Sequence, residues 1–427
     1  MFKRVLIANR GEIAVRIIRA CQEMGIETVA VYSDEDADAM HVRLADYSYN
    51  IGPADASESY LNIDALMEAA ERTEADAVHP GYGFLSEDAD FAEMVTKAGM
   101  TWIGPWADTI RKVGDKDEAR AAMIPSGIPM SKGSTPLTSV EDAVEQAKDV
   151  GYPIILKPVA GGGGKGMLIA NSEDDLRNIL TIIDINKVKY YFEHYIEHSR
   201  HIEVQIVADN YGHVIHLGER ECSLQRRNQK LLEESPSIAL TPDRRAEVGA
   251  LAIKAAKSVH YNNIGTVEFL LDLKTNQFNF MEINPRIQVE HGVTEAVTGI
   301  DLVRTQIRIA AGESLDLQQE DVKFTGHAIE CRINAEDPDN NFMPSPGKID
   351  FFLEPGGPRV RVDSGVCAGL SISPYYDSLI AKIVVRGRTR GDAIKIMRRA
   401  LNEFKVGGIK TTIPLHQRIL KNEYFCT

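Results

Sequence analysis

Residues 282–290 read Glu-Ile-Asn-Pro-Arg-Ile-Gln-Val-Glu, with a polar side chain at every second position. Side chains alternate across an extended strand, so this pattern predicts one strand with its polar groups on a single face. Those groups are Glu282, Asn284, Arg286, Gln288 and Glu290. A generic alternating strand turns its polar face to water. A cation, amides and acids in this order favour a binding site instead, and other segments have to decide.

A second strand is predicted upstream, at residues 266–272, which read Thr-Val-Glu-Phe-Leu-Leu-Asp. A turn at residues 274–276 would pair the two strands as a hairpin and bring Glu268 beside Glu282. Two carboxylates and the amide oxygen of Asn284 form the hard oxygen cluster that Mg²⁺ prefers. The hairpin therefore suggests a metal-bound nucleotide.

The composition sets outer limits on the kind of protein. The chain has 427 residues, of which 44% are hydrophobic and 26% charged, which suggests roughly three domains of a globular protein. A formal charge of −14 argues against a general nucleic-acid binder. The five cysteines contain no C-x-x-C pair, so neither a disulfide framework nor a zinc site is indicated.

No targeting or membrane segment is expected. The apolar run at residues 5–8 is too short for the core of a signal peptide or for a membrane span. Together with the free cysteines, this predicts a soluble protein of the reducing cytoplasm.

The first hundred or so residues alternate strand and helix patterns, which is typical of a parallel α/β sheet. Strands are predicted at 4–8, 27–33, 75–79 and 101–104, and helices at 13–24, 63–73 and 88–98. The stretch 79–87, His-Pro-Gly-Tyr-Gly-Phe-Leu-Ser-Glu, is a loop near a strand end, where open α/β sheets place ligands. A structural turn is an equally good reading of this loop.

A second unit is expected from about residue 114 to about residue 311. A capping box at 139–142 begins a helix that ends at Val150, and strands follow at 153–157 and 167–170. Between these strands lies Gly-Gly-Gly-Gly-Lys-Gly at residues 161–166. It fails the Rossmann pattern because a strand follows it, and the P-loop pattern because Gly166 stands where Ser or Thr is required. What remains is a hairpin that can close over phosphates, with Lys116 and Lys157 as possible sources of positive charge.

Motifs spread over nearly the whole chain resemble those of the biotin carboxylases of the ATP-grasp superfamily. They lie at residues 5–13, 79–84, 157–166, 201–205, 221–227, 282–291 and 330–336. So many long motifs in the same order are far more specific than any one of them.

The resemblance implies an α/β and α+β fold in three domains. A parallel α/β domain would cover residues 1–113, an ATP-grasp domain residues 114–323, and a C-terminal biotin carboxylase domain residues 324–427. The ATP-grasp domain would carry a mobile lid at about residues 130–196. Its closure would exclude water from a labile intermediate.

The resemblance also implies the reaction. ATP with Mg²⁺ (or Mn²⁺) and bicarbonate would form carboxyphosphate, whose carboxyl group passes to N1′ of biotin. Glu268 and Glu282, assisted by Asn284, would hold the metal. Glu290 would act as general base, and Arg332 would hold the biotin enolate. The implied catalytic residues are Arg286, Glu290, Lys230 and Arg332, and the implied bicarbonate site is Lys230, Arg286, Gln288 and the backbone of Val289.

The implied nucleotide site draws on all parts of the ATP-grasp domain. Lys116 and Lys157 match the phosphate-binding lysines of the family, residues 193–196 match its adenine segment, and His201 matches its ribose-side histidine. The full set is Lys116, Lys157, Gly163, Gly164, Lys165, Gly166, Met167, Glu193, His194, Tyr195, Ile196, His201, Asn228, Glu268 and Glu282.

Departures from the family pattern keep an alternative open. His194 replaces the usual Lys, Asn228 replaces the usual His, and residues 179–191 form a shorter segment than usual. The first hypothesis is an active biotin carboxylase, and the second is a catalytically weak subunit that binds nucleotide and partners. A different ATP-grasp ligase is a third, against which Arg332 and its motif argue.

The resemblance implies partners as well. The chain contains no Ala-Met-Lys-Met attachment motif, so biotin would arrive on a separate biotin carboxyl carrier protein. No carboxyltransferase region is present, which implies a separate carboxyltransferase subunit. The family commonly forms homodimers, and Arg16, Arg19 and Glu23 on the first helix are candidates for that contact. No nucleic acid or membrane partner is expected.

Overall fold

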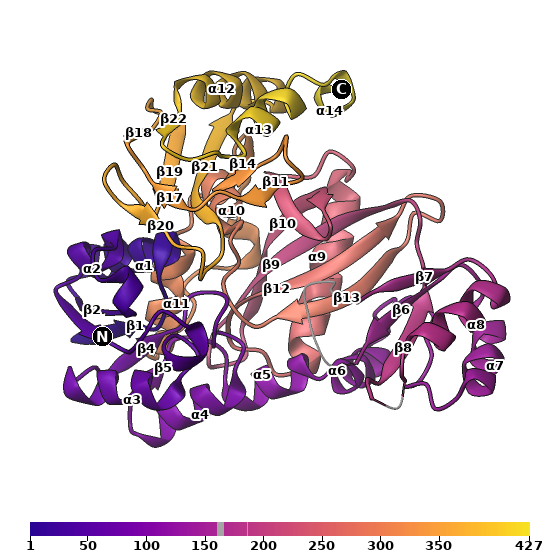
Figure 1. Cartoon of the computed structure of the whole chain (residues 1–427). Coiled ribbons are helices and arrows are strands. Elements are labelled where there is room, and N and C mark those ends of the chain that lie inside the picture. Colours follow the sequence, from indigo (N-terminus) through magenta and orange to yellow (C-terminus); the bar gives the residue numbers. More distant parts are fainter. Residues whose placement is uncertain (160–165, 186) are drawn as a thin grey trace.

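The computed structural model of the chain describes residues 1–159, 166–185 and 187–427. Figure 1 shows a parallel α/β part in indigo, a small part that projects on the other side, and a C-terminal part in orange and yellow above them. A long sheet lies at the centre. The predicted phosphate contacts Gly163, Gly164 and Lys165 lie outside the described residues.

The N-terminal part is a parallel sheet in the order β3-β2-β1-β4-β5. Its strands are β1 (Arg4–Ile7), β2 (Glu27–Tyr32), β3 (Tyr47–Asn50), β4 (Ala77–His79) and β5 (Thr101–Trp102), and its helices are α1 (Gly11–Glu23), α2 (Met40–Leu44), α3 (Ile63–Arg72), α4 (Ala89–Lys97) and α5 (Ala107–Gly114). The predicted elements are confirmed to within two residues at each end. The sequence pattern does not reveal β3, because that strand is mostly exposed and polar.

The central sheet is antiparallel and runs in the order β13-β12-β9-β10-β11-β14-β21-β19. Its strands are β9 (Ser199–Ala208), β10 (Val214–Arg226), β11 (Gln229–Ser235), β12 (Asn263–Asp272), β13 (Phe278–Asn284), β14 (His327–Asn334), β19 (Val360–Ser364) and β21 (Leu379–Gly387). The sheet therefore continues from the middle of the chain into its C-terminal part without a break.

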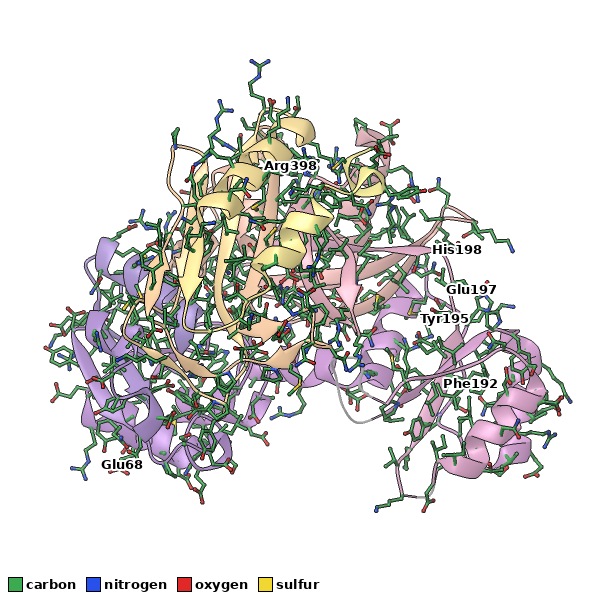
Figure 2. All side chains as sticks on the ribbon, turned by 45° about the horizontal axis from the view of Figure 1, so that its top comes forward. Glu68, Phe192, Tyr195, Glu197, His198 and Arg398 are labelled. Carbon is green, nitrogen blue, oxygen red and sulfur yellow. The ribbon has the colours of Figure 1, made fainter. Side chains whose placement is uncertain are left out.

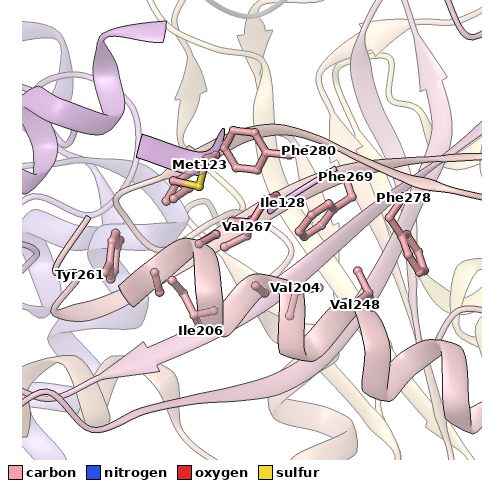
Figure 3. Packing of buried hydrophobic residues seen from close by; sticks show 14 of the residues in the cluster. Met123, Ile128, Val204, Ile206, Val248, Tyr261, Val267, Phe269, Phe278 and Phe280 are labelled. Atoms are coloured by element: carbon pink, nitrogen blue, oxygen red, sulfur yellow. The ribbon is translucent and has the colours of Figure 1, made fainter. Parts of the chain in front are cut away.

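The two faces of the central sheet differ sharply. On β9, Ile202, Val204 and Ile206 pack into an apolar core with α9 (Pro242–Ser258), as Figure 3 shows in part. His201 and Glu203 alternate with them and so point to the other face. Burying the apolar face fixes the register of the strand, because a slip by one residue would turn every side chain over. The polar face is thereby held in place for the site.

The opposite face of the sheet carries α10 (His291–Thr298) and α11 (Leu302–Ala310). α10 contacts β10, β14 and β21, and α11 contacts β12 and α1. On the apolar face, α12 (Arg390–Glu403) covers β14 and β21, near the edge of the sheet that β19 forms. The C-terminal part also contains β15 (Glu336–Asp337), β16 (Met343–Pro344), β17 (Gly347–Lys348), β18 (Phe351–Leu353), β20 (Ser371–Ile372), β22 (Lys405–Gly407), α13 (Ile413–Ile419) and α14 (Glu423–Cys426).

The projecting part has a sheet of its own, in the order β7-β6-β8. It is built from α7 (Val140–Val150), β6 (Ile154–Pro158), β7 (Leu168–Ala170), α8 (Glu173–Ile182) and β8 (Tyr190–His194), and α6 (Lys116–Met123) precedes it. Leu156, Leu176 and Phe192 belong to its separate apolar core. Figure 2 labels Phe192, Tyr195, Glu197 and His198 along the stretch that leads from β8 back to the central sheet. The predicted strands and helix of this part are confirmed to within one residue or two.

One strand prediction is wrong in its extent. The strand expected over residues 282–290 ends at Asn284, where β13 stops. Pro285 follows, and proline has no N–H to continue a ladder. Residues 285–290 form a loop that leads into α10, with Glu290 at the N-cap position. The polar side chains beyond Asn284 are therefore placed by a loop and not by strand alternation.

Among the residues that the structure describes, no helix combines the length and the apolar character needed to cross a bilayer. All five cysteines lie in the described part of the chain and are free thiols, as the sequence predicts.

Candidate active site

The predicted hairpin is confirmed, and it sets the geometry of the site. Glu268 on β12 is paired in register with Glu282 on β13, and Thr266 with Asn284. On its other side Glu268 is paired with Glu203 of β9. Directly opposed residues present their side chains on one face. A row of carboxylates therefore crosses the central sheet on the face away from α9.

Lys230, on β11, is the cation at the centre of this row. Its Nζ donates hydrogen bonds to Glu203, to Glu290 Oε1 at 2.8 Å and to Glu268 Oε1 at 3.3 Å. Burial lowers the pKa of Lys230, but Glu268 and Glu290 outweigh it and raise the pKa above its usual value. Lys230 therefore stays protonated and joins a loop and three strands of the sheet.

Glu290 is held by a cation at each oxygen. Arg332 on β14 donates from Nη2 to Glu290 Oε2 at 2.8 Å, and from Nε to Glu233 Oε1 at 2.6 Å. Burial would raise the pKa of Glu290, but Lys230 and Arg332 hold it well below the usual range. The carboxyl group is therefore ionised at neutral pH, in the form that can accept a proton.

His201 lies beside two carboxylates of this row, Glu268 and Glu203. Its Nε2 is 2.8 Å from Glu268 Oε2 and 3.2 Å from Glu203 Oε1. Its Nδ1 is 3.0 Å from Gln225 Nε2, which can only donate, so Nδ1 is the acceptor. Burial would raise the pKa of Glu268, yet Lys230 and His201 hold it well below the usual range. Glu268 is thus ionised.

Sequence reasoning missed several members of this network. Arg220 on β10 is fully buried and donates to Gln205 at 2.7 Å, to Glu203 at 3.3 Å and to Gln288 at 2.6 Å. It anchors the loop before α10 to the sheet. Glu203 and Gln205 alternate with His201 in the motif at 201–205, so the two-residue period could have identified them. Glu233 and Arg220 carry no comparable signal.

The last residue of β13 and residues of the loop after it also converge on this row. Gln288 donates from Nε2 to Glu268 Oε1 at 2.8 Å, and so does Asn284 from Nδ2 at 2.8 Å. Arg286 donates to Asn284 Oδ1 at 3.2 Å and to Glu87 Oε1 at 2.6 Å. Glu87 belongs to the loop that follows β4. The N-terminal part therefore contributes a carboxylate to the edge of the site.

Glu268, Glu282 and Asn284 lie at neighbouring register positions of β12 and β13 and could together hold a hard divalent ion. Glu282 is open to solvent, yet the protein around it desolvates its carboxyl group, and together with Glu268 and Glu87 this raises its pKa. Mutual repulsion of these carboxylates is relieved by a cation, and with Asn284 they offer oxygen ligands alone. The described residues also include the groups His201–Glu203–Glu268 and Glu203–Cys222–Glu290 within ligand distance. Lys230 already supplies the positive charge between those carboxylates.

Predicted nucleotide contacts lie on the projecting part and on α6. Lys157 Nζ donates to Glu193 Oε2 at 2.7 Å, and Arg120 Nη1 donates to Glu193 Oε1 at 2.8 Å. Lys116 Nζ lies 6.0 Å from the ring centroid of Tyr191. Sequence reasoning did not single out Arg120. These contacts bring the two predicted lysines and the predicted adenine segment to the same side of the projecting sheet.

The remaining predicted nucleotide contacts either hydrogen-bond to backbone carbonyls or lie in turns and connections between strands. His194 Nδ1 lies 3.0 Å from the carbonyl of Gly151, and the Tyr195 N–H donates to the carbonyl of Pro153 at 2.8 Å. Gly166 and Met167 directly precede β7, and Ile196 lies between β8 and β9. Asn228 has a positive φ of 64° in the tight turn between β10 and β11, a conformation that asparagine tolerates well.

Family models match three consecutive stretches of the chain. "Biotin carboxylase, N-terminal domain" matches residues 1–110, "Carbamoyl-phosphate synthase L chain, ATP binding domain" residues 115–318, and "Biotin carboxylase C-terminal domain" residues 330–427. "Biotin carboxylase 1" of Bacillus subtilis (strain 168) is 55% identical over 100% of this chain and 96% of its own. "Biotin carboxylase" of Haemophilus influenzae is 51% identical over 100% of this chain and 96% of its own.

A solved structure agrees with these matches. The biotin carboxylase domain dimer of the Hydrogenobacter thermophilus 2-oxoglutarate carboxylase, in complex with MgADP, ADP and bicarbonate, has a TM-score of 0.95 and 48% identity. The match covers 100% of this chain and 95% of that one. The fold, with its acidic central sheet and its separate projecting part, defines an ATP-grasp ligase. The chain belongs to the biotin carboxylase family.

Proposed function

We propose that this chain uses MgATP and bicarbonate to form carboxyphosphate, and then transfers the carboxyl group to biotin on a separate carrier protein. The single observation that carries the proposal is the environment of Glu290: its two oxygens are each 2.8 Å from a partly buried cation, Lys230 at one and Arg332 at the other. A carboxylate kept ionised in this way can accept a proton at the site where the anionic substrates bind.

Glu290 is the proposed general base that deprotonates bicarbonate. Its low pKa makes it a weak base on its own. Lys230 and Arg332 compensate, because they also stabilise the second negative charge that forms on the substrate. When the proton moves to Glu290, the cations that held the carboxylate become available to the new anion. Proton transfer and anion stabilisation are thus performed by one network.

Bicarbonate is proposed to bind beside this base, at Arg286, Gln288 and the backbone of Val289, with Lys230 nearby. Arg286 provides a planar fork of donors that suits the oxygens of a carboxylate or a carbonate. Its ion-pair partner is Glu87, whose side chain is 48% exposed. An exposed partner is given up more readily than a buried one, so Arg286 can turn to an incoming anion.

Arg332 is proposed to hold the enolate of biotin after the ureido nitrogen loses its proton. Its guanidinium is desolvated by burial, yet Glu233 and Glu290 raise its pKa further above the usual value. It stays a cation at any working pH. A fixed positive charge in a site shielded from water stabilises a developing anion more strongly than solvent does.

The nucleotide is proposed to lie between the central sheet and the projecting part. Lys116 and Lys157 would contact phosphates, and residues 193–196 with His201 would contact adenine and ribose. Glu268, Glu282 and Asn284 would hold Mg²⁺, which supplies positive charge to the phosphates during transfer. Residues 130–196 are proposed as the lid, and residues 113/114 and 323/324 as the domain boundaries.

The catalytically weak subunit is the second candidate, and it rests on His194 and Asn228. The His194 ring lies 3.0 Å from the carbonyl of Gly151, so it makes a structural contact within the proposed lid. This contact is an argument against the second candidate. Asn228 lies in a turn whose positive φ suits asparagine. Neither replacement removes a member of the buried network around Lys230.

The proposed partners are a second copy of this chain, a biotin carboxyl carrier protein and a carboxyltransferase subunit, with the whole system in the cytoplasm. Of the α1 candidates for the dimer contact, Arg19 and Glu23 are exposed. Arg16 instead donates within the chain, to Glu295 at 3.0 Å and Asp301 at 2.7 Å. Arg19 and Glu23 are therefore the better variants for a test of dimerisation.

The proposed function is tested by ATP hydrolysis with the purified chain. We expect hydrolysis that requires bicarbonate and that free biotin stimulates. Nucleotide binding without either dependence would favour the weak subunit. Hydrolysis that depends on a different acid acceptor would favour another ATP-grasp ligase.

A further inference from the structure

A fully buried cation, Lys382, lies beside Arg332 in the central sheet. Arg332 on β14 is paired in register with Lys382 on β21, and Lys382 is paired in turn with Asp363 on β19. Directly opposed residues share one face of a sheet. Lys382 is fully buried at 0% exposure. Its side chain therefore lies next to that of Arg332, on the face of the sheet that α10 covers.

Lys382 reaches the loop that precedes α10. Its Nζ donates a hydrogen bond to the backbone carbonyl of Val289, while its neighbour Arg332 donates to the side chain of Glu290 at 2.8 Å. Two in-register residues of adjacent strands thus hold two consecutive residues of the loop. Residues 285–290 have no strand ladder to fix them, so side-chain contacts of this kind decide where the loop lies.

The surroundings of Lys382 keep it charged. Its Nζ is 3.3 Å from Glu12 Oε1 of α1, and Tyr82 of the loop after β4 donates to the same oxygen. Burial lowers the pKa of Lys382, but Glu12, Glu330 and Asp363 outweigh it and raise the pKa above its usual value. The cation therefore ties the N-terminal part, the central loop and the C-terminal strands together at one buried point.

We propose that Lys382 is a positioning residue for the bicarbonate step, acting through Val289 and Glu290 without touching substrate. The inference rests on the proposed function of those two residues. Without the Lys382 contact, the loop would lose one of its two adjacent anchors and Glu290 would shift from its bicarbonate geometry. Small displacements of reacting groups reduce rates by about 100-fold. The lysines of the nucleotide site lie on other elements and would keep their positions.

The test uses Lys382→Met in the full chain, with Lys395→Met as the matched control. Lys395 is exposed on α12, in the same C-terminal part. We expect Lys382→Met to lower kcat/KM for bicarbonate by about 100-fold and to leave KM for ATP within about twofold. The control should leave both constants unchanged. Because removal of one buried charge leaves Glu12 unbalanced, Lys382→Met/Glu12→Gln serves as a second, charge-balanced variant.

Each outcome decides the matter. Folded variants whose bicarbonate constants match the wild type would overturn the proposal, and so would equal losses for ATP and bicarbonate, which indicate general damage. Failure of both variants to fold would assign Lys382 to stability instead of positioning, and would overturn it as well. A wild-type chain without bicarbonate-dependent hydrolysis would instead refute the proposed function, so the two failures are distinguishable.

Discussion

Arg332 Nη2 donates to Glu290 Oε2 at 2.8 Å, which joins strand β14 to the N-cap of α10 across 42 residues of sequence. The other oxygen of Glu290 accepts from Lys230. The proposed biotin-binding arginine and the proposed base are therefore parts of one charge network. A change in either residue alters the proton affinity of the other.

The role of Glu290 is tested by Glu290→Gln. The amide has nearly the same shape but cannot accept the bicarbonate proton. Since general base catalysis contributes roughly 10²–10⁴-fold, we expect bicarbonate-dependent ATP hydrolysis to fall by at least about 100-fold, with ATP affinity retained. Glu71→Gln, at an exposed position of α3, is the matched control. An unchanged rate for Glu290→Gln would refute the assignment of the base.

The coupling of Arg332 to Glu290 predicts a shift in pH dependence. Burial raises the pKa of Glu290 and the cations lower it, so that it lies well below the usual range. Arg332→Gln removes one cation, and the pKa of Glu290 must then rise. Because the ionised form is the active one, the acid limb of kcat/KM for bicarbonate should move to higher pH.

The measurement is bicarbonate-dependent ATP hydrolysis without biotin, which avoids the proposed biotin role of Arg332. Arg418→Gln, at an exposed position of α13, should leave the profile in place. If the acid limb of kcat/KM for bicarbonate keeps its position in Arg332→Gln, or moves to lower pH, Glu290 does not govern that limb.

Glu282→Gln tests the proposed metal site. The substitution removes one charged oxygen ligand, so we expect the Mg²⁺ concentration for half-maximal rate to rise about tenfold, which corresponds to about 1.4 kcal/mol. The rate should recover at high Mg²⁺. Glu145→Gln, exposed on α7, controls for a lost surface charge. The same Mg²⁺ requirement in Glu282→Gln and wild type would remove Glu282 from the metal site.

His194→Lys tests the alternative of a catalytically weak subunit, because it restores the residue usual in the family. The His194 ring lies 3.0 Å from the carbonyl of Gly151, and a single side-chain hydrogen bond contributes about 1 kcal/mol. We therefore expect KM for ATP and kcat to change by no more than about fivefold. A gain of a hundredfold in kcat would show that His194 suppresses activity, in favour of the weak subunit.

Much of the site could be predicted where the chain is locally regular. The pairing of Glu268 with Glu282 followed from two alternating runs and a turn, because strand periodicity and a short loop together fix the register. Apart from β3, the N-terminal strands were equally readable from apolar periodicity. In both cases the signal lies within a few consecutive residues.

The rest depends on contacts between distant segments. Arg220 and Lys382 are fully buried cations whose partners come from several elements, and the sequence around each of them does not show which partners it meets. The strand end at Asn284 was missed because the polar alternation continues past Pro285 in sequence but not in structure. Tertiary contacts hold that loop, and sequence periodicity cannot show which contacts a loop will make.

The central claim is most directly tested by transfer of label from radiolabelled bicarbonate to biotin, with ATP and Mg²⁺ and the purified chain. We predict labelled carboxybiotin that requires both ATP and Mg²⁺ and that is absent with Glu290→Gln. ATP bound tightly by a folded chain that forms no labelled carboxybiotin, on free biotin or on a biotinylated carrier protein, would contradict it.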